Sequence, residues 1–285
     1  MFSDLIDEVF AEFSKFKPGA LITTKHGRYG LKAETYEIST QSEKRAFHKD
    51  IGKYTLLYLK DLMEDEDHFE YYLDEFARAL RPYLSDVHTN DVVLVVGLGN
   101  RHISADSLGI NVIKNLIITR SMVKSMPKVC AFSPSVMGLT GIETADTVDA
   151  ITRKIKPNYV VFVDSLCASH SERLGRSFQI SNTAVTPGEG VDNTRKKFVA
   201  KGVKVVSIGV PFVVYSDTFI KSAFNDLKID IKSIKNSELK GKLNKLFTSD
   251  NPQLVTLKDI EEIVEKAGKL IAMALNRIII GVDKL

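Results

Sequence analysis

Four short runs of β-branched and other apolar residues constrain the fold of this chain more than any other feature. They lie at 91–96, 129–132, 159–163 and 203–208. Runs of this length and composition are typical of strands buried on both faces of a parallel sheet. Stretches with helical periodicity lie between them, at about 106–124, 143–155 and 190–201. This alternation predicts an α/β fold with a mostly parallel sheet and helices on both faces.

The flanks of this core carry signals of local structure. Residues 1–16 have apolar side chains at spacings of three and four, which predicts an amphipathic helix that ends before Pro18. Residues 21–39 are predicted to form two short strands or a hairpin, and residues 42–79 are predicted to form helical segments. Residues 257–280 are predicted to form one long helix.

Length and composition are those of a folded protein. The 285 residues are 44% apolar and 26% charged, close to the averages of globular chains. We expect a single α/β domain over residues 1–285, in which 91–214 form the core and 253–285 contain a closing helix.

Charge and cysteine content argue against several classes of protein. A net charge of +3 gives no strong attraction to nucleic acid or to a membrane. The first residues are acidic where a secretory signal is basic, and no run approaches the ~18 apolar residues of a membrane span. Cys130 and Cys167 are not spaced as a metal knuckle or a disulfide framework. These features predict a cytoplasmic protein with no membrane partner and no direct nucleic-acid partner.

Two aspartates occupy the places where an open parallel sheet binds its ligands. Asp106 follows the first core strand, and Asp164 comes directly after the run YVVFV. Each of them alone is explained equally well as the N-cap of a following helix. Together, at the carboxyl ends of strands in one crevice, they form a pair that can share a proton and activate water.

Two rival chemistries fit the sequence less well. Gly97 and Gly99 begin a dinucleotide-binding motif, but His102 stands at the third glycine and the next strand ends without an acid. Cys167 lies near His170 in sequence, which suggests a nucleophile with a base, although buried packing explains the cysteine as well. No nucleophile-elbow motif accompanies them.

Four blocks of sequence resemble the germination proteases, which degrade the small acid-soluble proteins that coat DNA in dormant spores. The resemblance is strongest over about 90–214, where GIET, QIS and PGEGVDNTRK occur in the family's order. The blocks are VVGLGNRHISADSLG (95–109), FSPSVMGLTGIETADTV (132–148), VDSLCASHSERLGRSFQISNTAVTPGEGVDNTRK (163–196) and IGVPFVV (208–214).

The resemblance implies an endopeptidase of aspartic type that needs no cofactor and acts on small acid-soluble spore proteins. It implies a fold like that of the hydrogenase-maturation peptidases (phosphorylase-like), a homotetramer, a self-processing zymogen and a place in the spore core. The catalytic pair falls on Asp106 and Asp164. The residues implied to line the substrate cleft are Asn100, Glu143, Thr144, Gly188 and Gly190. The last four are explained alternatively as a capped helix start and a plain turn.

The chain departs from the family's pattern at several positions. The family usually has glycine where Ser135 and Asp192 stand, and arginine where Ser169 stands. Thr186 occupies the place of a histidine that ligates metal in the related maturation peptidases, so the resemblance implies no metal here. These departures leave two alternatives: a metal-dependent peptidase of the same fold, and an inactive homologue that binds peptides or proteins.

Residues 1–18 are interpreted either as a pro-segment or as an ordinary N-terminal helix. The family cleaves after glutamate and before an apolar residue. The Glu8–Val9 and Glu12–Phe13 bonds fit that pattern. One of them is therefore a hypothetical self-processing site.

Overall fold

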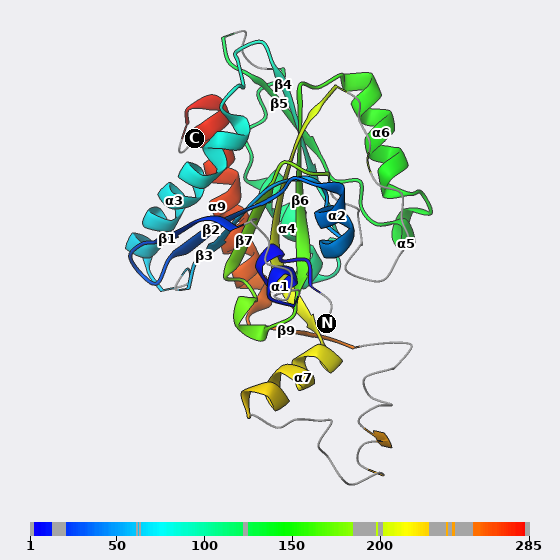
Figure 1. The fold of residues 1–285 in the computed structure, drawn as a ribbon. Helices are drawn as coiled ribbons and strands as arrows, with labels where there is room; N and C mark the ends of the chain where they lie inside the picture. The colour runs from blue at the N-terminus through cyan, green and yellow to red at the C-terminus, as the bar shows by residue number, and fades with distance from the viewer. Residues whose placement is uncertain are drawn as a thin grey trace.

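The computed structural model describes residues 3–12, 21–60, 62, 64–121, 125–184, 198, 202–227, 238, 241–242 and 253–282. These residues build an α/β fold around one large sheet (Figure 1). None of the helices among them is long and apolar enough to cross a membrane.

The described strands form one sheet in the order β1-β2-β3-β7-β8-β6-β4-β5, with β9 paired to β8. In chain order the strands are β1 (Leu21–His26), β2 (Lys32–Ile38), β3 (Gly52–Tyr58), β4 (Val92–Gly97), β5 (Lys128–Phe132), β6 (Tyr159–Ala168), β7 (Ser177–Ser181), β8 (Lys204–Tyr215) and β9 (Leu254–Thr256).

The sheet is mixed, so the prediction of a mostly parallel sheet is only partly right. The pairs β8–β6, β6–β4 and β4–β5 are parallel, as the four apolar runs predicted. The pairs β1–β2, β2–β3, β3–β7, β7–β8 and β8–β9 are antiparallel. Antiparallel strands can be joined by short connections, and the β1–β2 hairpin turns at Gly27 to Leu31.

Helices cover both faces of the sheet, as predicted. The helices are α1 (Ile6–Glu12), α2 (Gln41–Phe47), α3 (Glu66–Leu84), α4 (Leu108–Lys114), α5 (Met137–Thr140), α6 (Thr144–Ile155), α7 (Ser216–Asp226) and α9 (Ile260–Ile280), with short 3₁₀ turns η1 (Ser104–Asp106) and η2 (Ser171–Arg173). Helices α3, α4 and α9 share one face and one apolar cluster. On the other face α6 packs on β4 and β6, and α1 with α2 packs on β2 and β3.

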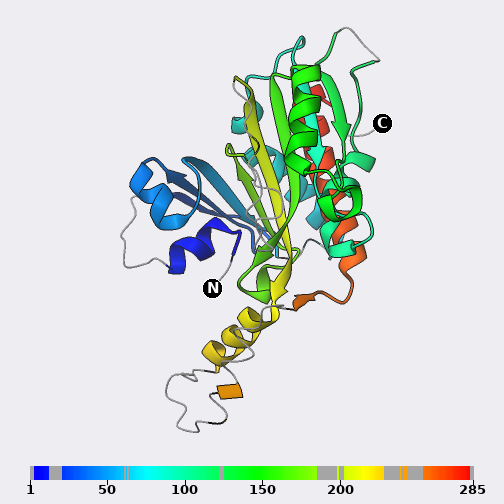
Figure 2. The same ribbon diagram turned by 90° about the vertical axis from the view of Figure 1, so that its right-hand side faces the viewer.

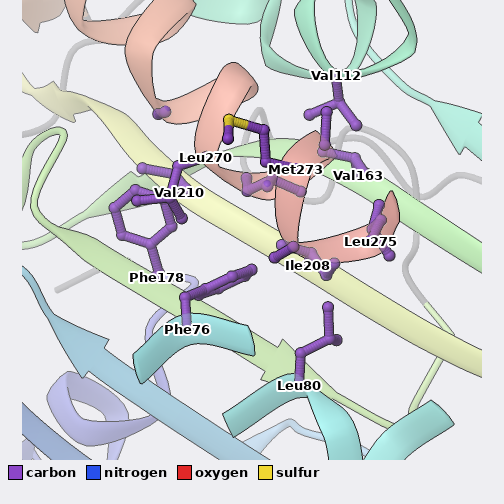
Figure 3. Packing of buried hydrophobic residues seen from close by; sticks show 14 of the residues in the cluster. Phe76, Leu80, Val112, Val163, Phe178, Ile208, Val210, Leu270, Met273 and Leu275 are labelled. Carbon is purple, nitrogen blue, oxygen red and sulfur yellow. The ribbon is translucent and has the colours of Figure 1, made fainter. Parts of the chain in front are cut away.

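The main core lies between the sheet and the pair α3 and α9. Figure 3 shows Phe76 and Leu80 of α3 on one side of this core and Leu270 of α9 on the other. Phe76 meets Phe178 of β7 edge to face, with ring centroids 5.6 Å apart. Full burial of side chains of this size stabilises a fold by roughly 1.5–3 kcal/mol each. This cluster therefore holds the long closing helix that 257–280 predicted.

The N-terminal segment is built into the body of the protein. Leu5 and Ile6 are both 0% exposed and pack in the cluster beneath α1 and α2. The carboxylate of Glu8 accepts the N–H groups of Ser169, at 2.7 Å, and His170, at 3.1 Å. Figure 2 shows α1 beside the strands that precede α3, at the opposite side of the molecule from the C-terminus.

Three strands, β3, β7 and the three-residue β9, were not predicted, and one predicted helix lies outside the described residues. The segment 42–79 was expected to be helical throughout, but it contains β3 between α2 and α3. β3 is buried because it is an inner strand of the sheet with helices above and below it. β7 is an inner strand of the same kind. The predicted helix at 190–201 falls almost wholly outside the described residues.

Candidate active site

The order in which successive strands are added to the sheet reverses between the parallel strands β4 and β6. From β4 the chain passes through α4, on one face, to β5 at the edge of the sheet. From β5 it returns through α6, on the other face, to β6 on the far side of β4. Such a switch point leaves a crevice at the carboxyl ends of the strands, where ligands bind in open α/β sheets. Asp106 follows β4, and Asp164 lies in β6, so the two aspartates flank this point.

Alternation along β6 places Asp164 on the face that carries α6. Val161 and Val163 face the cluster beneath α3 and α9, whereas Val160 and Phe162 face α6. Since side chains alternate along a strand, Asp164 continues the α6 side. On that side the middle of the sheet, between α6 and the pair α1 and α2, carries small or polar residues that line a cavity. They include Gln179, Ser181, Ser207 and Gly209.

Asp106 is held by the turn that follows β4. The N–H of Asn100 donates to the Asp106 carbonyl oxygen at 2.9 Å and to its carboxylate Oδ2 at 3.0 Å. Gly99 has a φ of +112°, and a Cβ there would lie 2.0 Å from the Asp106 carbonyl oxygen. Only glycine fits this close approach without a shift of the backbone. Gly99, the second glycine of the sequence that resembles a nucleotide-binding motif, therefore helps to position an aspartate.

The two aspartates open into one cavity of about 880 Å³. Four acidic residues line it. Asp50 pairs with Lys44, and we refer to the other three as the acidic cluster: Asp4, Asp106 and Asp164. Four basic residues of α2 and the loop after it also line it, and we refer to them as the basic cluster: Lys44, Arg45, His48 and Lys49. The cavity therefore contains both signs of charge, carried on different elements.

The surroundings of Asp164 favour its protonated form. Burial raises the pKa of Asp164 well above its ordinary value of 3.8, and the negative charges of Asp106 and Asp4 raise this pKa further. The N–H of Ser165 donates to Asp164 Oδ1 at 2.9 Å and lowers the pKa. Two close carboxylates resist ionising together, so one of the pair keeps its proton at a pH where free aspartate is charged.

The N-cap explanation is wrong for Asp164. β6 continues past this residue to Ala168, so Asp164 lies within a strand and begins no helix. Asp106 ends the turn η1, and its carboxylate accepts from Asn100, which precedes it in the chain. Both aspartates therefore have roles that capping does not explain.

The structure brings together only part of the predicted substrate cleft. Asn100 and Thr144 line the cavity, and the Thr144 hydroxyl donates to the Ser135 carbonyl oxygen at 3.2 Å. Glu143 precedes α6 without capping it, and its Oε1 is buried with no hydrogen-bond partner among the described residues. Gly188 and Gly190 lie outside the described residues.

Cys167 is not arranged as a nucleophile. Burial raises the pKa of its thiol, and Asp4 raises it further, so the reactive thiolate is disfavoured. His170, the neighbouring base in sequence, has its Nδ1 at 2.9 Å from Glu8 Oε1 instead. Among the described residues no three His, Cys, Asp or Glu side chains are grouped as ligands for a metal ion.

Asp4 and the basic cluster were not predicted from the sequence. Asp4 is about 160 residues away from Asp164 in sequence, and it reaches the cavity only because the N-terminal segment packs beside β6. The basic residues of α2 follow the ordinary pattern of a solvated helix face. No local signal in the sequence separates such residues from surface charge.

Paired acids that line a cavity at the switch point of a sheet are typical of hydrolases that activate water.

A sequence model of the family described as germination protease matches residues 12–229. The germination protease of Clostridium tetani is 32% identical, over 90% of this chain and 87% of that relative. The protein of the same name from Clostridium acetobutylicum is 33% identical over 89% of each chain. A Bacillus velezensis germination protease is 35% identical over 68% of this chain and 56% of its own length.

The chain belongs to the germination protease family, a family of peptidases. The resemblance that the sequence blocks predicted is thereby confirmed.

Replacing Ser135 by glycine is expected to stabilise the fold by about 1 kcal/mol. Ser135 has a φ of +64°, in the left-handed region that costs residues with a Cβ roughly 1–2 kcal/mol. Urea denaturation of the parent and Ser135→Gly measures the effect. In the control, Ser85→Gly, the φ of −60° is an ordinary helical value, so we expect a small loss. Equal effects at the two positions would contradict the strain.

Asp164→Asn is expected to raise the melting temperature, and the gain should grow from pH 4 to pH 7. The folded state raises the pKa of Asp164 above its unfolded value of 3.8. Its contribution to stability is therefore complete below that value and is lost as pH rises toward the raised pKa. Asparagine, being neutral, suffers no such loss. Calorimetry at both pH values measures the difference, with Asp149→Asn, an exposed acid paired with Arg153, as the control. A gain that is the same at both pH values would refute the raised pKa.

Proposed function

We propose that this protein is an endopeptidase that hydrolyses small acid-soluble spore proteins during germination, with Asp106 and Asp164 as the catalytic pair. One observation carries the proposal: the two aspartates line the same cavity, and the charge of Asp106 raises the pKa of Asp164. Membership of the germination protease family supports the peptidase activity and its timing during germination. The aspartic mechanism is inferred from the site, and the substrate is inferred from the resemblance to the family.

In this mechanism Asp106 is the base and Asp164 is the acid. Ionised Asp106 takes a proton from a water molecule while the water oxygen attacks the carbonyl carbon of the peptide bond. Asp164 gives its proton to the carbonyl oxygen, which produces a tetrahedral intermediate with two hydroxyl groups. Asp106 then returns its proton to the leaving nitrogen as the C–N bond breaks, and one hydroxyl proton returns to Asp164. Both carboxyl groups end in their starting states.

The basic cluster supports an acidic substrate. Lys44, Arg45, His48 and Lys49 come from α2 and the residues just after it, and they line the cavity that holds the aspartates. Lys44 binds Asp50 at 2.8 Å, whereas Arg45 and His48 are exposed. Cationic side chains beside a cleft attract acidic peptides and orient them. We infer that acidic segments of the substrate bind here.

Three further properties are proposed from the family alone. They are a homotetrameric assembly, synthesis as a zymogen, and a location in the cytoplasm that becomes the spore core. Self-processing at Glu8–Val9 gains no support from the geometry, because neither residue lines the cavity and the Glu8 carboxylate is bound to Ser169 and His170. The Glu12–Phe13 bond includes a residue outside those described.

Cleavage of a recombinant small acid-soluble spore protein, followed by mass spectrometry, tests the function. We expect the parent to cut it, and Asp106→Asn and Asp164→Asn each to lower kcat/KM by about 10²–10⁴, the usual contribution of a general acid or base. Asp149→Asn is the matched control, because this exposed aspartate lies on α6 away from the cavity lining.

Three outcomes would overturn parts of this proposal. A parent that binds the substrate but never cuts it would show a binding protein. Activity that is lost with a strong chelator and restored by a divalent metal would show a metal-dependent peptidase of the same fold. Full activity in either Asp→Asn variant would remove that aspartate from the mechanism.

Arg45→Glu is expected to raise the KM for an acidic substrate about tenfold, with a smaller change in kcat. A tenfold change corresponds to about 1.4 kcal/mol, which is reasonable when one attractive charge in a cleft becomes repulsive. Lys25→Glu makes the same charge change on exposed β1, away from the cavity, and should leave KM nearly unchanged. Equal KM values for Arg45→Glu and the parent, in low salt, would rule out the basic cluster as a substrate site.

A further inference from the structure

Asp4 reaches the cavity by pairing with the strand that carries Asp164. Its N–H donates to the Cys167 carbonyl oxygen at 2.9 Å, and its carboxylate Oδ2 accepts the Cys167 N–H at 2.8 Å. Asp4 is 8% exposed and lines the same cavity as Asp106 and Asp164. The third acid of the cluster is therefore fixed to β6 three residues beyond Asp164.

The segment around Asp4 is held from several sides. The N–H of Ile6 donates to Gln179 Oε1 at 2.8 Å, and Gln179 Nε2 donates to the Asp4 carbonyl oxygen at 3.1 Å. Leu5, between them, is fully buried. Anchors on both β6 and β7 leave Asp4 little freedom to turn away from the cavity. A hydrogen bond to Cys167 alone would need no such double attachment.

The charged groups that face Asp164 and Asp4 come from four parts of the structure. Asp164 faces Asp106, from the turn after β4, and Asp4, from the N-terminal segment. Asp4 in turn faces Lys49, from the loop after α2, and Glu8, from α1. The pKa of Asp4 is raised, because burial and the charge of Glu8 outweigh the lowering effects of Lys49 and the Cys167 N–H. Those two contacts offset part of the cost of the Asp4 charge, and that charge raises the pKa of Asp164.

We propose that Asp4 is a positioning residue of the proposed protease site: it keeps the proton on Asp164 and so leaves Asp106 ionised as the base. The inference rests on the proposed function for its meaning in catalysis, but not for its test. Two carboxylates that share a site can hold one proton in either of two ways. Each carboxylate accepts a backbone N–H, Asp106 from Asn100 and Asp164 from Ser165. The third negative charge, beside Asp164, is what breaks this symmetry.

Carboxyl-carbon NMR of protein labelled with ¹³C-aspartate measures the proton on Asp164 directly. The full chain is titrated, and the Asp164 signal is identified by its absence in Asp164→Asn. In Asp4→Asn we expect the Asp164 midpoint to move to lower pH, because the amide oxygen can still accept from Cys167 but the charge is gone. Asp4→Glu, which keeps the charge, should restore much of the parent midpoint.

Glu8→Gln is the matched control. Glu8 is a buried acid of the same segment, but it binds Ser169 and His170 and does not line the cavity. We expect this variant to leave the Asp164 midpoint in place. Melting temperatures identify variants that fail to fold, and Asp4→Ser replaces Asp4→Asn if that variant does. An unmoved midpoint in a folded, uncharged Asp4 variant overturns the inference.

Activity measurements separate this inference from the proposed function. If the protein is a peptidase, the alkaline limb of its kcat/KM profile should move to lower pH in Asp4→Asn. Activity should then fall several-fold above the optimum and change less below it. A purely structural role for Asp4 would lower activity at all pH values and leave the limb in place. If the parent cuts nothing, the proposed function fails, and the NMR midpoint still decides the role of Asp4.

Discussion

The site depends on the parallel pairing of β4 with β6. Gly97 is the register partner of Val163, and the N–H of Leu98 donates to the Val163 carbonyl oxygen at 2.8 Å. This register ends β4 just beside Asp164, so the turn that follows must pass over that carboxyl group. Because Gly99 has no Cβ, the turn can close tightly, and Asp106 lies against Gly99. A shift of one residue would send Asp164 to the face covered by α9 and separate the pair.

The chain brings acids together where burial makes their charges costly. Asp4 and Asp164 both have raised pKa values, and burial is the largest cause for each. Apolar clusters on both faces of the sheet stabilise the fold and offset the free-energy cost of burying these acids. The long helix α9 and the double anchor of the N-terminal segment hold the surrounding elements in place. A destabilised pair of acids within a rigid frame is typical of an active site rather than of a structural ion pair.

The sequence predicted the parts of the fold that local pattern determines. The apolar runs became β4, β5, β6 and β8, and the periodicity at 257–280 became α9. β3 and β7 were missed because an inner strand of a mixed sheet draws its stability from neighbours that are distant in sequence. Asp106 and Asp164 were predicted to line one site because each of them follows a recognisable apolar run. Asp4 was not, because its position depends on contacts with Cys167 and Gln179, which no pattern within its own segment encodes.

Contacts between segments that are distant in sequence also make the site asymmetric. Asp106 and Asp164 each follow an apolar run of a buried parallel strand, and sequence alone does not distinguish base from acid. The difference comes from what lies next to each of them. Both carboxylates accept a backbone N–H, Asp106 from Asn100 and Asp164 from Ser165, so these hydrogen bonds do not distinguish them. Asp164 lies between Asp106 and a segment from the other end of the chain that adds a further negative charge. The acid and base roles that we propose for two chemically identical residues therefore depend on tertiary structure, through the N-terminal segment that packs against β6.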